Sequence, residues 1–141
     1  MNLTFHTPGG IEGESMRIIQ QELDEMGIIL DPDCADVVRR AIHTTADFDY
    51  AKNLIFTPEA ASAGAAALRS GTPIITDTNM ARSGINQKAC TQFGVERFCY
   101  MADPEVAQAA KEHGTTRAVA AVDRWAQEHP NAIFAVGNAP T

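Results

Sequence analysis

The spacing of apolar residues along the chain follows two periods, which predict helices alternating with short strands. Apolar side chains recur at helical spacing over 11–26, which predicts a helix that ends at Gly27. A second helix is expected to begin at Asp31, an N-cap followed by a proline, and to carry His43 in its last turn. Further helical segments are expected at 60–68, 79–84, within 86–95, at 104–113 and at 116–128.

The same periodicity identifies the side chains that should face the interior of each helix. We expect inward faces made of Met16, Ile19, Leu23 and Met26 in the first helix, Val37, Val38, Ala41 and Ile42 in the second, and Val119, Val122 and Trp125 in the last.

Four short apolar runs, at 53–57, 73–77, 97–101 and 132–136, are typical of buried strands. Strands that alternate with helices are joined by right-handed crossovers, which give a mainly parallel sheet. We therefore expect an α/β fold, namely a three-layer, flavodoxin-like, doubly wound sheet with an N-terminal helical segment, as a single domain over residues 1–141.

Polar residues follow the expected strands at their carboxyl ends, where ligands bind in sheets of this type. They are Thr57, Asp77, Asn79, Asp103 and Asn138. The alternative is that they cap the helices that follow. Thr57 and Asp103 each precede a proline, which favours capping, whereas the two interpretations are equally supported for the other three.

The composition of the chain argues against several classes of binding partner. The chain carries a formal net charge of −7 and no basic run, which argues against nucleic acid and anionic membranes as partners. No apolar run has membrane-spanning length and no signal peptide is recognisable, so we expect a cytoplasmic location. The three cysteines show no CxxC spacing, which indicates neither a disulfide framework nor a zinc site.

The densest chemistry lies at residues 39–49, with two guanidinium groups, an imidazole, two hydroxyls and two carboxylates. A helix C-terminus favours the protonated form of His43, whereas Arg39 and Arg40 on the preceding turn favour the neutral form. His43 is therefore a candidate proton-transfer group beside groups that can hold an anion. The alternative is an ordinary helix-terminal cap or surface histidine.

Several common catalytic signatures are missing from the sequence. It contains no dinucleotide glycine fingerprint, no phosphate-binding P-loop, no Gly-x-Ser-x-Gly elbow and no spaced metal-ligand set. Any chemistry would therefore use an acid/base histidine, arginines for carboxylates and no evident cofactor or metal.

Five segments, taken in order, resemble one family. They are Ile11-Glu12-x-x-Ser15-x-Arg17-Ile18-Ile19, Arg40-x-Ile42-His43-Thr44-Thr45-Ala46-Asp47-Phe48, Thr76-Asp77-x-Asn79-Met80, Gly114-Thr115-Thr116-Arg117-Ala118 and Gly137-Asn138-Ala139-Pro140-Thr141. Together they resemble the precorrin-8X methylmutases, also called precorrin isomerases, over nearly the whole chain.

The resemblance implies an isomerase of cobalamin (vitamin B12) biosynthesis. Such enzymes move a methyl group between adjacent ring carbons of a corrinoid, converting precorrin-8X to hydrogenobyrinate or cobalt-precorrin-8 to cobyrinate. It also implies a flavodoxin-like fold, a homodimer and no added cofactor. The sequence leaves open whether the substrate contains cobalt.

The resemblance also assigns roles to residues. His43 matches the histidine that exchanges a proton with the macrocycle, and Arg17 and Arg40 match substrate-contacting positions. The remaining substrate-binding candidates, supported by motif and placement alone, are Ser15, Thr44, Asn79, Thr116, Arg117 and Asn138.

Family members continue beyond the segment that matches 137–141. The sequence therefore predicts a chain that lacks the family's C-terminal segment and leaves its last strand with an exposed edge or face. Three alternatives to an active isomerase follow: a non-catalytic corrinoid-binding or carrier protein, an inactive fragment, or a module that binds another anionic ligand. Visible absorbance separates them, because corrinoids are coloured.

Overall fold

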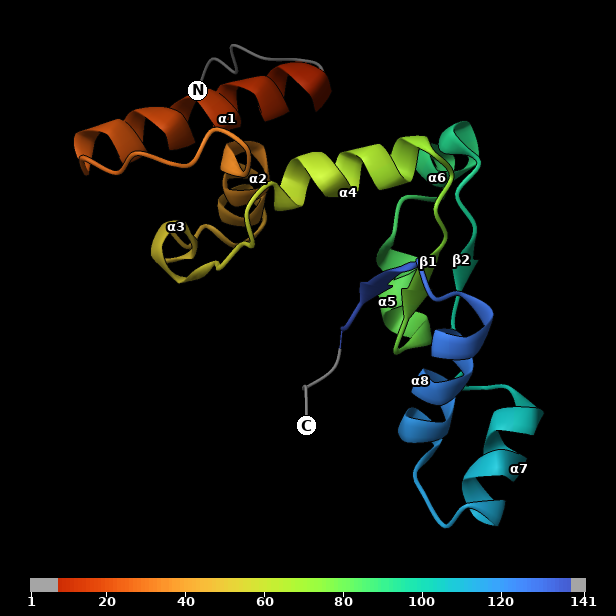
Figure 1. Cartoon of the computed structure of the whole chain (residues 1–141). Helices are drawn as coiled ribbons and strands as arrows, with labels where there is room; N and C mark the ends of the chain where they lie inside the picture. Colours follow the sequence, from red (N-terminus) through yellow and green to blue (C-terminus); the bar gives the residue numbers. More distant parts are fainter. Residues whose placement is uncertain (1–7, 138–141) are drawn as a thin grey trace. The chain divides into compact units, whose positions relative to one another are not determined.

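The computed structural model describes residues 8–137, which form two compact units with the boundary between Ala63 and Gly64. The first unit is helical, with α1 (Pro8–Glu25), α2 (Ala35–Thr45) and α3 (Tyr50–Asn53). The boundary falls within α4 (Ala60–Arg69). The second unit contains β1 (Ile74–Thr76), α5 (Asn79–Gly84), α6 (Gln87–Phe93), β2 (Arg97–Phe98), α7 (Pro104–Glu112), α8 (Arg117–Glu128) and β3 (Ile133–Ala135) (Figure 1). None of the helices described is long and apolar enough to cross a membrane.

The first unit is organised by the packing of α1 on α2. Ile19 and Leu23 from α1 meet Val38 and Ile42 from α2 in one buried cluster. Full burial of a side chain of this size contributes about 1.5–3 kcal/mol, so these four side chains fix how the two helices pack. The sequence predicted all four as inward positions.

Not every residue of the predicted stripes is buried. Met26 is 55% exposed and Val37 is 46% exposed, so the prediction that they face inward is wrong. Met26 lies past the last residue of α1, where the helical period no longer applies. Val37 lies on α2 beside a surface cavity that is described below.

The end of α1 confirms the predicted role of Gly27. Its φ is +68°, a conformation that glycine adopts without a Cβ penalty. The amide of Gly27 donates to the carbonyl of Asp24, and the amide of Ile28 donates to that of Leu23 at 2.9 Å. This pair of bonds is a Schellman motif, which satisfies the last carbonyls of the helix.

The start of α2 differs from the prediction. The N-cap position is Cys34 and not Asp31, and no side chain caps the helix there. Asp31 instead closes a turn, accepting from the amide of Asp33 at 2.9 Å through its side chain and from that of Cys34 through its carbonyl. The intervening acid, Asp33, is engaged with a different helix.

Asp33 caps α4 from a distance in sequence. Its carboxylate accepts hydrogen bonds from the amides of Ala61 and Ser62, both at 3.0 Å, and from the Ser62 hydroxyl. The Ser62 hydroxyl and these amides hold the pKa of the Asp33 carboxyl below its usual value, against the opposite effect of partial burial. Thr57, the predicted cap, contributes only its carbonyl, which accepts from Ala60.

We expect Asp33→Ala to lower the melting temperature of the protein by roughly a few degrees, because two helical amides lose their acceptor. A lowered pKa in the folded state means that the stabilisation is present above the pKa of the unfolded state and is lost as pH falls through the acid range. Thermal unfolding at pH 7 and pH 4 measures this. The gap between wild type and variant should narrow at pH 4, and a gap of the same size at both values would contradict the capping role.

The predicted strand at 53–57 is not a strand. Residue 53 ends α3, and residues 54–57 belong to none of the strands of the part of the chain that the structure describes. Leu54 and Phe56 pack on the α1–α2 cluster, whereas Ile55 is 94% exposed. The apolar run therefore serves a helical core and not a sheet.

The second unit contains a three-stranded parallel sheet in the order β2-β1-β3. In the register, Ile74 of β1 lies opposite Arg97 of β2 and opposite Ile133 of β3. The other three predicted strands are thereby confirmed, each shorter than expected. The α/β class with a parallel sheet is confirmed as well. In the described residues β3 pairs with β1 alone, so it forms an edge of this sheet, as predicted.

Helices α7 and α8 pack against each other beside this sheet (Figure 1). Asp103 caps α7, as predicted, and Thr116 caps α8, so that Thr116 lies before the helix and not in it. Trp125 is buried with Ile75 in the core, as expected. The prediction that Val119 and Val122 face inward is wrong, because they are 48% and 45% exposed on the other side of α8.

A polar cluster joins the end of the sheet to α8. The Tyr100 hydroxyl donates to Glu128 at 2.8 Å and lies 3.1 Å from Nε2 of His129. Arg124 binds Asp103 and Glu128 and lies over the Tyr100 ring. Burial, reinforced by the hydrogen bond to Glu128, raises the pKa of Tyr100 to about 12.

We expect this cluster to make stability sensitive to alkaline pH. Because the pKa of Tyr100 in the folded state lies above its ordinary value near 10, the contribution is complete below pH 10 and is lost as pH rises toward 12. Between pH 9 and pH 11 the free energy of unfolding should fall by ~1 kcal/mol more in the wild type than in Tyr100→Phe. Urea unfolding of both proteins measures the difference, and equal losses would contradict the raised pKa.

Candidate functional site

The polar faces of α1 and α2 meet at a serine–histidine pair. Ser15 Oγ lies 2.7 Å from Nδ1 of His43, although the two residues are 28 positions apart. His43 is in the last turn of α2, as predicted, and its side chain is exposed. A hydroxyl can donate to the neutral ring nitrogen or accept from the protonated one, so the pair keeps its hydrogen bond when the imidazole gains or loses a proton.

Two arginines lie close to this pair in sequence and are paired with carboxylates of α1. Arg17 is two residues after Ser15, and its Nε and Nη2 atoms donate to both carboxylate oxygens of Glu14, at 2.9 and 2.6 Å. Arg40 is three residues before His43 and forms an ion pair with Glu12 at 2.6 Å. The Arg17 guanidinium holds the pKa of Glu14 below its usual range.

A third arginine bridges the two helices. Arg39 donates to Oε1 of Gln20 on α1 and to Oδ1 of Asp36 on α2, both at 2.5 Å. Its side chain is 26% exposed, so Arg39 is held more firmly than the other two arginines. The sequence placed Arg39 and Arg40 on the side of His43, but Arg39 is turned toward Gln20 and Asp36 instead.

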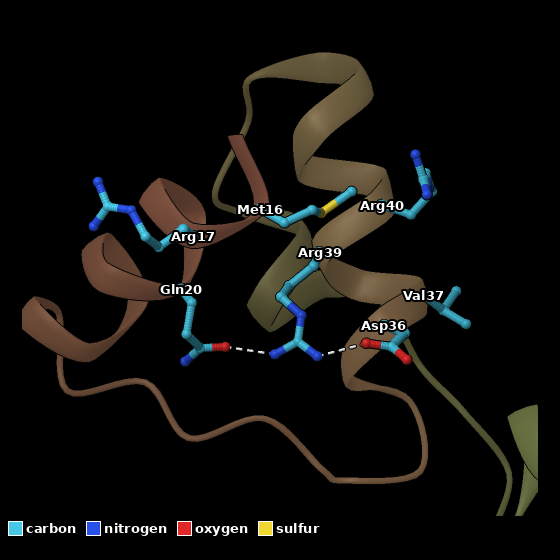
Figure 2. A pocket seen from close by; sticks show the side chains of 7 residues that line it. All are labelled: Met16, Arg17, Gln20, Asp36, Val37, Arg39 and Arg40. Carbon is cyan, nitrogen blue, oxygen red and sulfur yellow. Dashed lines mark hydrogen bonds and ion pairs between the residues drawn. The ribbon is translucent and has the colours of Figure 1, made fainter. Parts of the chain in front are cut away.

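These side chains surround a surface cavity of about 660 Å³. Figure 2 shows Arg39 at its centre between Gln20 and Asp36, with Arg17 to one side and Arg40 to the other. The other lining residues are Met16, which reaches from α1 toward α2, and Val37 (Figure 2). The cavity therefore combines three guanidinium groups, which suit carboxylates, with two apolar side chains.

Comparison with known proteins gives the family. A family model described as precorrin-8X methylmutase matches residues 10–141. The chain belongs to the precorrin-8X methylmutase family. It is 48% identical over 106 residues to the cobalt-precorrin-8 methylmutase of Salmonella typhimurium, and 36% identical over 134 residues to that of Priestia megaterium. Its fold is similar to the crystal structure of precorrin-8X methylmutase from Thermus thermophilus, with a TM-score of 0.79 and 41% sequence identity.

Each match covers a larger share of the length of this chain than of the length of the relative. The Salmonella match covers 74% of the chain and 50% of that protein, and the Priestia match covers 95% and 59%. The Thermus structure is matched over 92% of the chain and 62% of its own length. The chain thus spans half to about three fifths of the length of these relatives.

Of the other predicted site residues, Thr44 and Thr116 each form a hydrogen bond with the backbone of their own helix. The Thr44 hydroxyl donates to the carbonyl of Arg40 at 2.9 Å, on the same helix. Asn79 and Arg117 are exposed residues at the starts of α5 and α8, and Thr116 caps α8 by accepting from the amide of Val119. Asn79, Thr116 and Arg117 belong to the second unit, and Asn138 lies outside the described residues.

Sequence reasoning missed the acidic and amide partners of the arginines. Glu14 lies three residues before Arg17, a spacing that predicts a helical ion pair and could have been noticed. The pairs Arg40–Glu12 and Arg39–Gln20 form between helices that are far apart in sequence, so no local signal predicts them.

Proposed function

We propose that this chain provides the proton-exchanging site of a corrinoid methylmutase. In this proposal it acts in cobalamin biosynthesis, moving a methyl group between adjacent ring carbons of precorrin-8X to give hydrogenobyrinate, or of cobalt-precorrin-8 to give cobyrinate. The observation that carries the proposal is the hydrogen-bonded Ser15–His43 pair on the same two helices as the three-arginine cavity. Membership of the methylmutase family supports it.

His43 is the proposed proton donor and acceptor. Protonation of a pyrrolic nitrogen makes the macrocycle more electron-poor, which eases migration of the methyl group. The substrate and the product of an isomerisation contain the same atoms. The imidazole that gives a proton to the macrocycle must therefore recover one before the next turnover. The Ser15 hydroxyl suits this cycle because it can stay bonded to Nδ1 in both protonation states.

Arg17 and Arg40 are the proposed anchors for the carboxylates at the edge of the corrinoid. Planar guanidinium groups bind carboxylates through two parallel hydrogen bonds, which orient a ligand as well as hold it. Met16 and Val37 of the same cavity offer apolar contact to the ring. Thr44, Asn79, Thr116, Arg117 and Asn138 remain proposed contacts on the family resemblance alone.

We also propose the flavodoxin-like, doubly wound form of the α/β fold in a single domain, together with a cytoplasmic homodimer. The strand order β2-β1-β3 supports the winding, because the chain moves in one direction from β1 to β2 and in the other from β2 to β3. With right-handed crossovers, the helices of these two connections would cover opposite faces of the sheet.

Titration with hydrogenobyrinate, followed by visible absorbance and calorimetry, tests whether the chain forms the proposed site. We expect saturable binding, because the product carries the same carboxylates as the substrate. The second step is to add precorrin-8X and follow its spectrum. Binding without conversion would leave a corrinoid-binding protein and exclude the isomerase, whereas no binding would exclude both.

A further inference from the structure

The cavity arginines of α1 and α2 already have carboxylate partners within their own chain. Glu14 takes up the Nε and Nη2 donors of Arg17, and Gln21 accepts from its remaining nitrogen, Nη1, at 3.3 Å. Glu12 takes up Arg40 at 2.6 Å. The proposed function assigns these two guanidinium groups to a ligand, and in the structure Nε and Nη2 of Arg17 and Nη2 of Arg40 face glutamates.

A ligand carboxylate needs the same donors. The Nε–Nη2 edge of Arg17 binds one carboxylate at a time, so a corrinoid carboxylate must displace Glu14 to use that edge. At Arg40 it must displace Glu12 to use Nη2. Displacement is feasible here because both pairs are exposed to solvent. The side chains of Arg17 and Arg40 are 61% and 58% exposed, and exposed ion pairs contribute little net stability.

We propose that Glu12 and Glu14 are internal ligands that the corrinoid carboxylates displace, and that this exchange sets both affinity and specificity. The inference rests on the proposed function, because it concerns the same two arginines. While the glutamates hold the guanidinium groups, the cavity presents a nearly neutral surface. A side-chain amide of a corrinoid carries no charge and therefore cannot displace a glutamate from an arginine. A ligand carboxylate replaces the glutamate carboxylate at the same guanidinium group. After the reaction, the glutamate can return to the arginine and so favours release of the product.

The competing interpretation is that the glutamates hold the arginines in a productive position. The two interpretations predict opposite changes in ligand affinity when the charge of a glutamate is removed. If the glutamates are competitors, removing their charge strengthens ligand binding. If they are supports, removing their charge weakens it.

The experiment measures the dissociation constant of hydrogenobyrinate for wild type, Glu12→Gln, Glu14→Gln and the double variant by visible titration. Glu22→Gln is the matched control, since Glu22 is an exposed residue of α1 with the same charge and without an ion pair among the described residues. We expect each of the two single variants to bind roughly three- to fivefold more tightly, and the control to bind like wild type. The tightening should be absent for the same corrinoid with its side-chain carboxylates converted to amides.

Each outcome has a defined meaning. Unchanged or weaker binding by Glu12→Gln and Glu14→Gln, with normal binding by wild type, overturns the inference and leaves the proposed function intact. Equal tightening by Glu22→Gln overturns it too, because the effect would then be one of net charge. Absence of binding by every protein overturns both the inference and the proposed function.

Discussion

Replacing His43 with alanine is expected to abolish conversion of precorrin-8X while leaving hydrogenobyrinate binding nearly unchanged. General acid–base groups contribute roughly 10²–10⁴-fold to rate, and a proton transfer without its group should slow by at least the lower value. The stability of the protein should change little, because His43 is exposed whereas its neighbour Ile42 carries the packing of α2.

Visible spectroscopy of the conversion, together with thermal unfolding, measures both halves of this prediction. His113→Ala is the matched control, because His113 is also an exposed histidine at a helix end, here that of α7. Conversion at the wild-type rate by His43→Ala would remove the residue from the mechanism. Loss of conversion together with loss of folding would also contradict the assignment of a purely chemical role.

The second large effect is expected at the two anchors. Arg17→Ala and Arg40→Ala should each weaken hydrogenobyrinate binding by about tenfold or more, since each removes a charge-assisted contact to a carboxylate. Arg17→Lys keeps the charge but loses the planar two-donor edge, so we expect an intermediate affinity.

Calorimetric titration in low salt measures these affinities, and Arg69→Ala controls for the general loss of a positive charge at an exposed arginine. The melting temperatures of all variants should stay close to that of wild type, because both arginines are exposed and their ion pairs are weak. An anchor whose replacement leaves the affinity unchanged is not part of the site.

Local signals in the sequence predicted much of the architecture. The apolar stripes of α1 and α2 identified the four side chains that join these helices. Gly27 marked the end of α1 because glycine adopts the left-handed conformation of the closing turn without a Cβ penalty. The parallel sheet followed from the alternation of strands and helices. These features depend on near neighbours in the chain, which is where sequence patterns carry information.

Features made by tertiary contact could not be predicted in this way. A run of four or five apolar residues fits a buried strand and a segment packed on helices equally well, so 53–57 was assigned wrongly. The Asp33 carboxylate could serve the helix beside it or α4, and its capture of Ala61 and Ser62 depends on folding of the unit.

In the candidate site, too, the sequence identified single residues but not the contacts between them. Family resemblance selected Ser15, Arg17, Arg40 and His43 individually. The packing of α1 on α2 joins Ser15 to His43 and places Arg17 and Arg40 at one cavity. The resemblance did not indicate that Ser15 bonds to His43 or that glutamates occupy the arginines. Those relations depend on side-chain geometry, from which the proposed mechanism and the exchange of carboxylates both follow.

The most direct test of the central claim is to mix the wild-type chain with precorrin-8X and record the visible spectrum over time. We expect the substrate spectrum to be replaced by that of hydrogenobyrinate, and the same mixture with His43→Ala to keep the substrate spectrum. A spectrum that stays unchanged with the wild-type chain would contradict the proposal that this chain is a corrinoid methylmutase.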